Sequence, residues 1–155
     1  MKKMYAILFL FNLQILFAQE QQVAWMNFEQ LEDSLQRERK PVFIYFYSDW
    51  CVYCKKMERH AFRDPEVVQI LNSNYYSVQM NANSRDSVLF DGTLFINEQA
   101  ETQRNPFHQL PLLLANRESS AITLPALLLL DRDFRIRKRA FRYLTSEQLR
   151  TFLKK

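Results

Sequence analysis

The chain of 155 residues contains only two cysteines and a single glycine. Two cysteines are too few for a scaffold held by several disulfide bonds, and they cannot supply the four ligands of an all-cysteine zinc site. They lie three positions apart, at Cys51 and Cys54. A disulfide between them would close a short loop and remove little entropy from the unfolded chain. A redox pair is therefore favoured over a purely structural bridge.

An excess of charge of one sign is also lacking. The chain carries 21 Lys and Arg against 17 Asp and Glu, a net charge of +4 at pH 7. Basic residues gather only between Arg132 and Arg142, where they alternate with apolar residues as on the solvated face of an edge strand. This balance is not typical of a nucleic-acid-binding protein, and no nucleic-acid partner is expected.

The sequence has no uninterrupted apolar run of about 20 residues, the length that a membrane-spanning helix needs. The nearest run is residues 5–18, which follows a basic start and contains two polar residues. Such a pattern is typical of a secretory signal peptide. We expect a signal peptide over residues 1–18 that is cleaved after Ala18, a periplasmic or secreted location, and one domain over residues 19–155. An uncleaved membrane anchor is the alternative.

The two cysteines lie where a strand gives way to a helix. Residues 42–47 are apolar and aromatic throughout, as in a strand buried on both faces, and a helix is expected to follow. If Cys51 takes the first helical position, unpaired N–H groups and the positive end of the helix dipole favour its thiolate. Cys54 lies one turn further along the same helical face, within disulfide distance but deeper. The pattern predicts Cys51 as the nucleophile and Cys54 as the resolving cysteine.

Metal binding is the main competing use of this cysteine spacing. His60 and His108 would have to complete a mixed site, and His60 lies nearly two helical turns beyond Cys54. Covalent haem attachment needs a histidine directly after the second cysteine, where this chain has Lys55. We therefore expect no metal ligands and no bound cofactor.

Start and stop signals divide the rest of the chain into helices and strands. Capping boxes at residues 27–30 and 145–148, and an Asp-Pro pair at 64–65, predict the starts of three helices. Further strands are expected over residues 75–80, 126–130 and 134–143. This order predicts an α/β layer fold.

Residues 84–120 are expected to form an insertion. Asp91-Gly92 lies between two β-prone runs, which is a strong hairpin signal, and the only glycine of the chain is expected where the turn needs a positive φ. A short helix is predicted to begin near Pro111, since a proline further inside a helix would disrupt it. The insertion is interpreted as a lid, as a partner-docking surface, or as a decoration packed on the edge of the sheet.

The sequence resembles the thioredoxin-like family, specifically its exported bacterial thiol-disulfide reductases and the C-terminal domain of the transmembrane thiol reductase of the periplasm. The resemblance begins near residue 25 and covers the chain outside the insertion. It is carried by residues 47–55, 62–67, 124–125 and 143–145. It implies a mixed central sheet flanked by helices, in which Cys51 attacks and Cys54 resolves.

The same resemblance implies how a substrate is held. Pro125 would be cis and face the cysteines, so that the Leu124 backbone meets an extended substrate peptide, with Trp50 at the border of the site. The implied partners are exported proteins that contain disulfide bonds and a membrane thiol donor, and the chain is expected to be a monomer.

Three positions depart from the family pattern. Tyr45 stands where thioredoxin carries a buried acid, Gln79 where it carries a lysine, and Arg142 where a glycine is usual. The family pattern therefore does not account for proton handling at Cys54, and Arg142 is expected to crowd or charge the substrate groove.

Two functions from different classes follow. The favoured one is an exported thiol-disulfide oxidoreductase that reduces rather than oxidises, by attack of Cys51 and displacement by Cys54. The alternative is a binding or copper-handling module of thioredoxin fold, in which the cysteines do not turn over.

Overall fold

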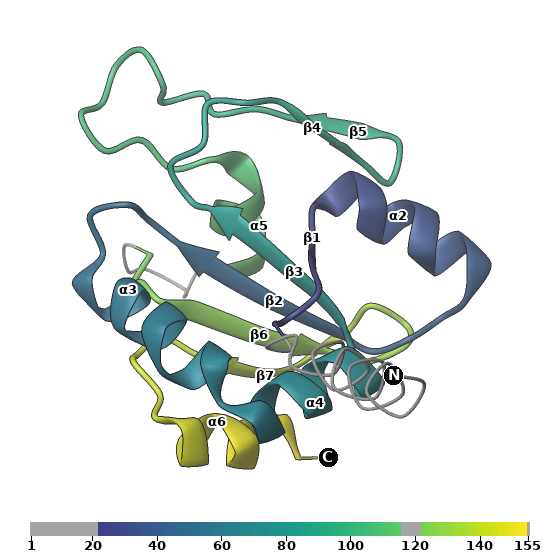
Figure 1. Cartoon of the computed structure of the whole chain (residues 1–155). Helices are drawn as coiled ribbons and strands as arrows, with labels where there is room; N and C mark the ends of the chain where they lie inside the picture. Colours follow the sequence, from purple (N-terminus) through teal and green to yellow (C-terminus); the bar gives the residue numbers. More distant parts are fainter. Residues whose placement is uncertain (1–21, 116–121, 155) are drawn as a thin grey trace, which may run out of the picture.

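The computed structural model describes residues 22–115 and 122–154, and the expected signal peptide with its cleavage site lies outside them. The described residues form a five-stranded sheet with flanking helices and a separate two-stranded hairpin (Figure 1). The strands of the main sheet follow the order β1 (Trp25–Met26), β3 (Tyr76–Asn81), β2 (Val42–Tyr47), β6 (Ala126–Leu130) and β7 (Ile136–Ala140). The hairpin is β4 (Val88–Phe90) and β5 (Thr93–Phe95). The helices are α2 (Phe28–Arg37), α3 (Val52–Arg59), α4 (Pro65–Asn74), α5 (Gln109–Ala115) and α6 (Ser146–Leu153), with a 3-10 turn at Ala61–Arg63.

The sheet is mixed, which confirms the predicted α/β fold. β2 runs parallel to β3 and antiparallel to β6, and β7 runs antiparallel to β6 at the edge. Phe46 therefore pairs with Ala126, and Tyr47 pairs with Asn81. As a result, the segment after β2, the segment after β3 and the segment before β6 all lie at one end of the sheet.

The central strand β2 is buried on both of its faces, as its apolar sequence predicts. Phe43 and Tyr45 belong to one core, and Val42, Ile44 and Phe46 belong to the other. Helices α3, α4 and α6 contribute to the first core, whereas α2, α5 and the hairpin contribute to the second, so the sheet lies between two layers (Figure 1). The strand that leads to the cysteines is thus among the most tightly enclosed parts of the fold.

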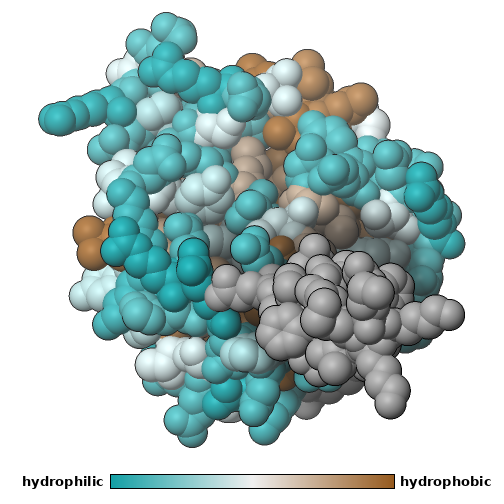
Figure 2. Space-filling view, viewed as in Figure 1, coloured by the Kyte–Doolittle hydropathy of each residue, from teal (hydrophilic) through white to brown (hydrophobic). Residues whose placement is uncertain are grey.

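The insertion covers one face of the sheet rather than its edge. Asp91 and Gly92 both adopt positive φ, at 51° and 68°, in the predicted hairpin turn. Phe90 packs edge-on against Phe28 of α2, with the ring centroids 5.3 Å apart. The opposite face of the hairpin exposes Leu89 and its cross-strand partner Leu94, and Figure 2 shows apolar side chains gathered over this region.

Helix α5 begins earlier than the sequence predicts. It starts at Gln109, so Pro111 is its third residue rather than its first. A proline is tolerated in a first turn because the N–H groups there have no intrahelical partner. The N–H of Leu110 is instead satisfied by Nδ1 of His108, at 3.2 Å, and a histidine in this capping role gives no recognisable sequence signal.

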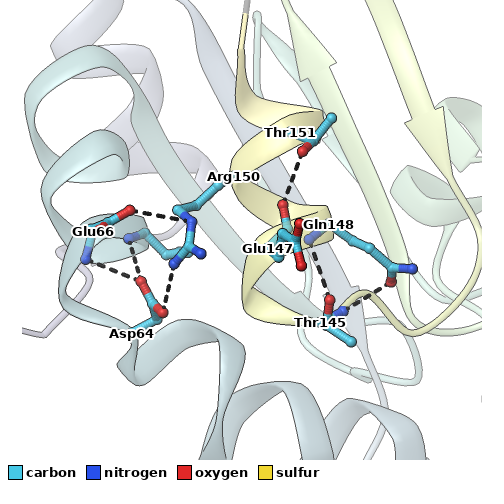
Figure 3. A network of polar contacts seen from close by, with 8 residues as sticks. Asp64, Glu66, Thr145, Glu147, Gln148, Arg150 and Thr151 are labelled. Atoms are coloured by element: carbon cyan, nitrogen blue, oxygen red, sulfur yellow. Dashed lines mark hydrogen bonds and ion pairs between the residues drawn. The ribbon is translucent and has the colours of Figure 1, made fainter.

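An ion-paired cap joins α4 to α6 (Figure 3). Asp64 accepts hydrogen bonds from the N–H groups of Glu66 and Val67, both at 3.1 Å, as the Asp-Pro start signal implies. The guanidinium of Arg150 on α6 lies 2.9 Å from the Asp64 carboxylate and 3.2 Å from that of Glu66. Burial by itself raises the pKa of Asp64, but the hydrogen bonds from Val67 and Arg150 and the charge of Arg150 outweigh it and hold the pKa below its usual value.

The variant Asp64→Asn keeps a capping oxygen but removes the charge that faces Arg150. Because the folded-state pKa is lowered, the charge stabilises the fold above the unfolded value of about 3.9, and this contribution is lost as the pH falls towards the folded value. We expect Asp64→Asn to lower the free energy of unfolding by about 1 kcal/mol at pH 7, and by less at pH 3, in urea denaturation.

The matched control is Asp133→Asn, because Asp133 pairs with Arg39 while both side chains are well exposed. It should change the free energy of unfolding very little at either pH. An equal loss for Asp64→Asn at pH 7 and pH 3 would contradict the assigned role of its charge.

Candidate active site

The two cysteines form a disulfide at the start of α3. The Cα atoms of Cys51 and Cys54 are 5.2 Å apart. The sequence predicts Cys51 as the first helical residue of α3. In the structure it is the N-cap, because the helix begins one residue later, at Val52. Its Sγ accepts a hydrogen bond from the N–H of Cys54 at 3.1 Å, while its own N–H donates to the carbonyl of Ser48. An N–H group directed at sulfur stabilises a thiolate more than a thiol, so the geometry favours Cys51 as the ionised cysteine.

Exposed apolar side chains surround a buried pair of sulfurs. Cys51 is 4% exposed and Cys54 is fully buried, which gives the predicted order of depth with only a small difference. Three neighbours are instead well exposed, Trp50 at 55%, Val52 at 74% and Tyr53 at 60%. We call these three side chains the apolar rim. Large apolar groups clustered around a reactive position indicate a contact surface rather than scattered surface hydrophobics.

Two asparagines, one at the end of β3 and one two residues beyond it, hold the turn that carries the cysteines. Oδ1 of Asn83 accepts hydrogen bonds from the indole N–H of Trp50, at 3.0 Å, and from the hydroxyl of Ser48, and its Nδ2 donates to the carbonyl of Pro106 at 2.6 Å. Asn81 donates from Nδ2 to the carboxylate of Asp49 at 2.9 Å. The turn is therefore fixed both from the main sheet and from the insertion.

The segment before β6 lies at the same end of the sheet. The Leu124–Pro125 peptide bond is cis, and Pro125 is buried. Leu124 is partly buried and packs against the core cluster that contains both cysteines. Leu124 and Pro125 thus lie at the end of the sheet that carries the cysteine turn, and Trp50 belongs to that turn.

Tyr45 occupies the position where the resemblance places an acid. It is fully buried on β2 in the core that includes both cysteines, and its hydroxyl donates to a carboxylate oxygen of Glu58 on α3 at 3.2 Å. Burial raises the pKa of Tyr45 far above its usual value, and the charge of Glu58 and the hydrogen bond to it act in the same direction. Tyr45 therefore stays a neutral donor and cannot act as a base. Gln79 pairs with it in register on β3 and is exposed.

A basic and aromatic group lies beside the apolar rim. The ammonium of Lys56 is 4.7 Å from the ring centroid of Tyr143, a cation–π contact, and that ring lies 6.2 Å from the ring of Tyr53. Arg142 is exposed, and within the described residues no hydrogen bond or ion pair engages its side chain. Arg142, which is expected to charge the substrate groove, directly precedes Tyr143 and so lies beside the rim.

The described part of the chain contains no group of three His, Cys, Asp or Glu side chains that could hold a metal ion. His60 is exposed and His108 is buried in the insertion, so neither is joined to the cysteines in such a group. Among the same residues, no helix combines the length and the apolar composition needed to cross a bilayer.

Comparison with known proteins gives consistent results. A family model described as thioredoxin-like matches residues 24–115. The thiol:disulfide interchange protein DsbD of Vibrio vulnificus is 31% identical over 94 residues, which cover 59% of this chain and 12% of that protein. DsbD of Salmonella typhimurium is 37% identical over 79 residues, covering 44% and 14%. The chain therefore spans only a small part of the length of these relatives.

Solved structures share the fold at low sequence identity. A thioredoxin from Thermus thermophilus superimposes with a TM-score of 0.59 at 15% identity, covering 85% of each chain. The reduced C-terminal domain of DsbD from Neisseria meningitidis gives a TM-score of 0.51 at 17% identity, covering 83% of this chain and 96% of that one. These similarities show the fold.

The hydrogen bond between Tyr45 and Glu58 can be tested by removing one hydroxyl. We expect Tyr45→Phe to lower the free energy of unfolding by about 1 kcal/mol, because a hydrogen bond to a charged group is lost while the exposed Glu58 is rehydrated. The measurement is urea denaturation at pH 7. The matched control is Tyr47→Phe, since the Tyr47 hydroxyl makes no hydrogen bond within the described residues. Equal losses in the two variants would contradict a specific role for the Tyr45 hydroxyl.

Proposed function

The chain belongs to the thioredoxin-like family, and from this premise we propose that it is an exported thiol-disulfide oxidoreductase that reduces disulfide bonds in other proteins. One observation carries the proposal. Cys51 caps α3 with its sulfur facing the N–H of Cys54, in a disulfide that closes a very short loop beneath the apolar rim. This arrangement stabilises a thiolate next to exposed apolar side chains that a partner can contact, whereas it adds little to the stability of the fold.

The proposed reaction transfers two electrons from the cysteine pair to the substrate. The Cys51 thiolate attacks one sulfur of a substrate disulfide, which forms a mixed disulfide and releases the other substrate sulfur as a thiolate. Cys54 loses its proton and attacks Sγ of Cys51, which releases the second substrate thiolate and forms the Cys51–Cys54 bond. The disulfide in the structure corresponds to the end of this cycle. A thiol donor must then reduce the pair again, and we propose a membrane protein for this step.

Cys54 has to lose its proton without a buried acid on β2 to accept it. Tyr45 holds that position as a neutral donor, and its burial keeps it so. The hydroxyl is directed to Glu58, which lies four residues beyond Cys54 on α3. The carboxylate that contacts Tyr45 therefore comes from the exposed face of α3 rather than from the sheet.

The substrate is proposed to lie across the apolar rim and the Leu124 backbone. Trp50 is held by Asn83 and is half-exposed, so it forms a fixed wall beside Cys51. Leu124 and Pro125 precede β6 at the same end of the sheet. An extended segment of the substrate can add to the Leu124 backbone as a strand does, while the rim contacts its side chains.

The location and the other partners belong to the same proposal. The basic start and the apolar run over residues 1–18 support export, with the domain over residues 19–155 acting in the periplasm or outside the cell as a monomer. Disulfide bonds persist in such compartments, so exported proteins with disulfides are the proposed substrates. The name of the DsbD relatives, thiol:disulfide interchange protein, supports the chemistry.

The proposal is tested by turnover of a protein disulfide. With dithiothreitol as donor, the chain should accelerate the reduction of insulin, and Cys51→Ser should lower the rate to the uncatalysed background. Cys54→Ala should instead accumulate a mixed disulfide, because attack remains possible while displacement is blocked. In a second assay, the chain should oxidise reduced ribonuclease more slowly than it reduces insulin.

Three results would correct the proposal at different levels. Faster oxidation than reduction would overturn the reducing direction. A mixed disulfide that accumulates on Cys54 in Cys51→Ser, and not on Cys51 in Cys54→Ala, would reverse the roles of the two cysteines. Absence of turnover in both directions would leave a binding module of the same fold.

A further inference from the structure

A groove opens between the edge strand β7 and helix α6. Its volume is about 710 Å³, and the residues that line it include Arg139, Arg142, Leu144, Glu147, Gln148 and Thr151. β7 is the last strand of the sheet, so its outer edge has no neighbouring strand within the described residues. We call this feature the cationic groove, for the reason given below.

The strand pairing places the cationic groove at the cysteine end of the sheet. β6 starts beside the end of β2, where Ala126 pairs with Phe46. β7 ends beside the start of β6, where Ala140 pairs with Leu127. Arg139 and Arg142 therefore lie at the end of β7 that is nearest the cysteine turn, whereas the turn that begins β7 lies at the opposite end.

Two carboxylates at that opposite end are paired with arginines. Asp131 lies 3.9 Å from Arg137, and Asp133 lies 3.5 Å from Arg39. At the cysteine end, Arg139 and Arg142 are both exposed, and within the described residues no carboxylate pairs with either of them.

Within the described residues, none of the acidic groups near the cysteine end forms an ion pair with these two arginines. Glu147 lines the groove, while Asp49 and Glu58 on the cysteine side accept hydrogen bonds from Asn81 and Tyr45. Lys56 adds a further cation over the ring of Tyr143. The lining of the groove itself carries two arginines, Arg139 and Arg142, against one carboxylate, that of Glu147.

Tyr143 links the groove to the surface proposed to bind the substrate, because its two chain neighbours, Arg142 and Leu144, line the groove. The Tyr143 ring contacts both the Lys56 ammonium and the ring of Tyr53 in the apolar rim. The next residue, Leu144, lines the groove and is buried in the core cluster that holds both cysteines. A segment bound across the rim can therefore extend past Tyr143 into the groove.

We propose that the cationic groove selects protein segments that carry carboxylates beside the cysteine attacked by Cys51. Guanidinium groups bind carboxylates through two parallel hydrogen bonds, so Arg139 and Arg142 provide geometric as well as charge complementarity. The partner is thus an acidic segment of a disulfide-containing protein. This inference rests on the proposed function, because it names the substrate class of the same site.

The first arm of the test compares two peptides that contain an internal disulfide and differ only in two positions next to the attacked cysteine, Glu-Glu in one and Lys-Lys in the other. We expect kcat/KM to favour the Glu-Glu peptide by about fivefold at low salt, from two exposed ion pairs, and the preference to shrink in 0.5 M NaCl. The double variant Arg139→Gln/Arg142→Gln should lose the preference.

The matched control for this double variant is Arg37→Gln/Arg132→Gln. Both of these arginines are exposed, Arg37 on α2 and Arg132 in the turn at the far end of β7, so the net charge changes equally. The control should keep the preference for the Glu-Glu peptide. Loss of the preference in the control as well would overturn the inference, because overall charge would then explain it.

The second arm measures binding without redox chemistry. Fluorescein-labelled versions of the two peptides, with serine in place of cysteine, are titrated with the oxidised protein and followed by anisotropy. Tighter binding of the Glu-Glu peptide that is lost in Arg139→Gln/Arg142→Gln and kept in the control supports the inference. If binding shows this preference but neither disulfide peptide is turned over, only the proposed function fails. Equal binding of the two peptides overturns the inference, while turnover of both disulfide peptides would still uphold the proposed function.

Discussion

The hydrogen bond from the N–H of Cys54 to the sulfur of Cys51 is the interaction on which the account of this protein depends. It exists because β2 ends and α3 begins within a few residues, so that Cys51 falls at the helix cap. Burial of β2 on both faces fixes the position of this junction. The chemistry of the site is thus a consequence of where a fully enclosed strand stops, and the polar groups around it serve to hold the turn in place.

The insertion takes part in holding that turn. Asn83 joins Trp50 and Ser48 to the carbonyl of Pro106, so the insertion is linked to the wall of the site through this one side chain. The hairpin of the insertion also packs on α2 through Phe90. The insertion thus packs on a face of the sheet rather than on its edge, and it is linked to the cysteine turn through Asn83.

Local signals in the sequence predicted most of the fold. The apolar run of β2, the capping boxes of α2 and α6, and the Asp91-Gly92 turn each depend on neighbouring residues, and each is confirmed. The two-residue strand β1 was missed because it is too short to show a period. Asn83 was missed for a different reason, since its hydrogen bonds join three separate segments and no local pattern encodes them. The cysteine pair needed only its own spacing and position, whereas the residues that frame it needed the tertiary structure.

The central claim, that the start of α3 makes Cys51 the attacking thiolate, is tested most directly by alkylation of the reduced protein. Iodoacetamide is added at a series of pH values, and mass spectrometry reads the label on each cysteine. The account predicts that Cys51 is labelled at least about tenfold faster than Cys54 at pH 7, and that Cys54→Ala preserves this rate because the backbone N–H is retained. Faster labelling of Cys54, or equal rates for the two cysteines, would contradict it.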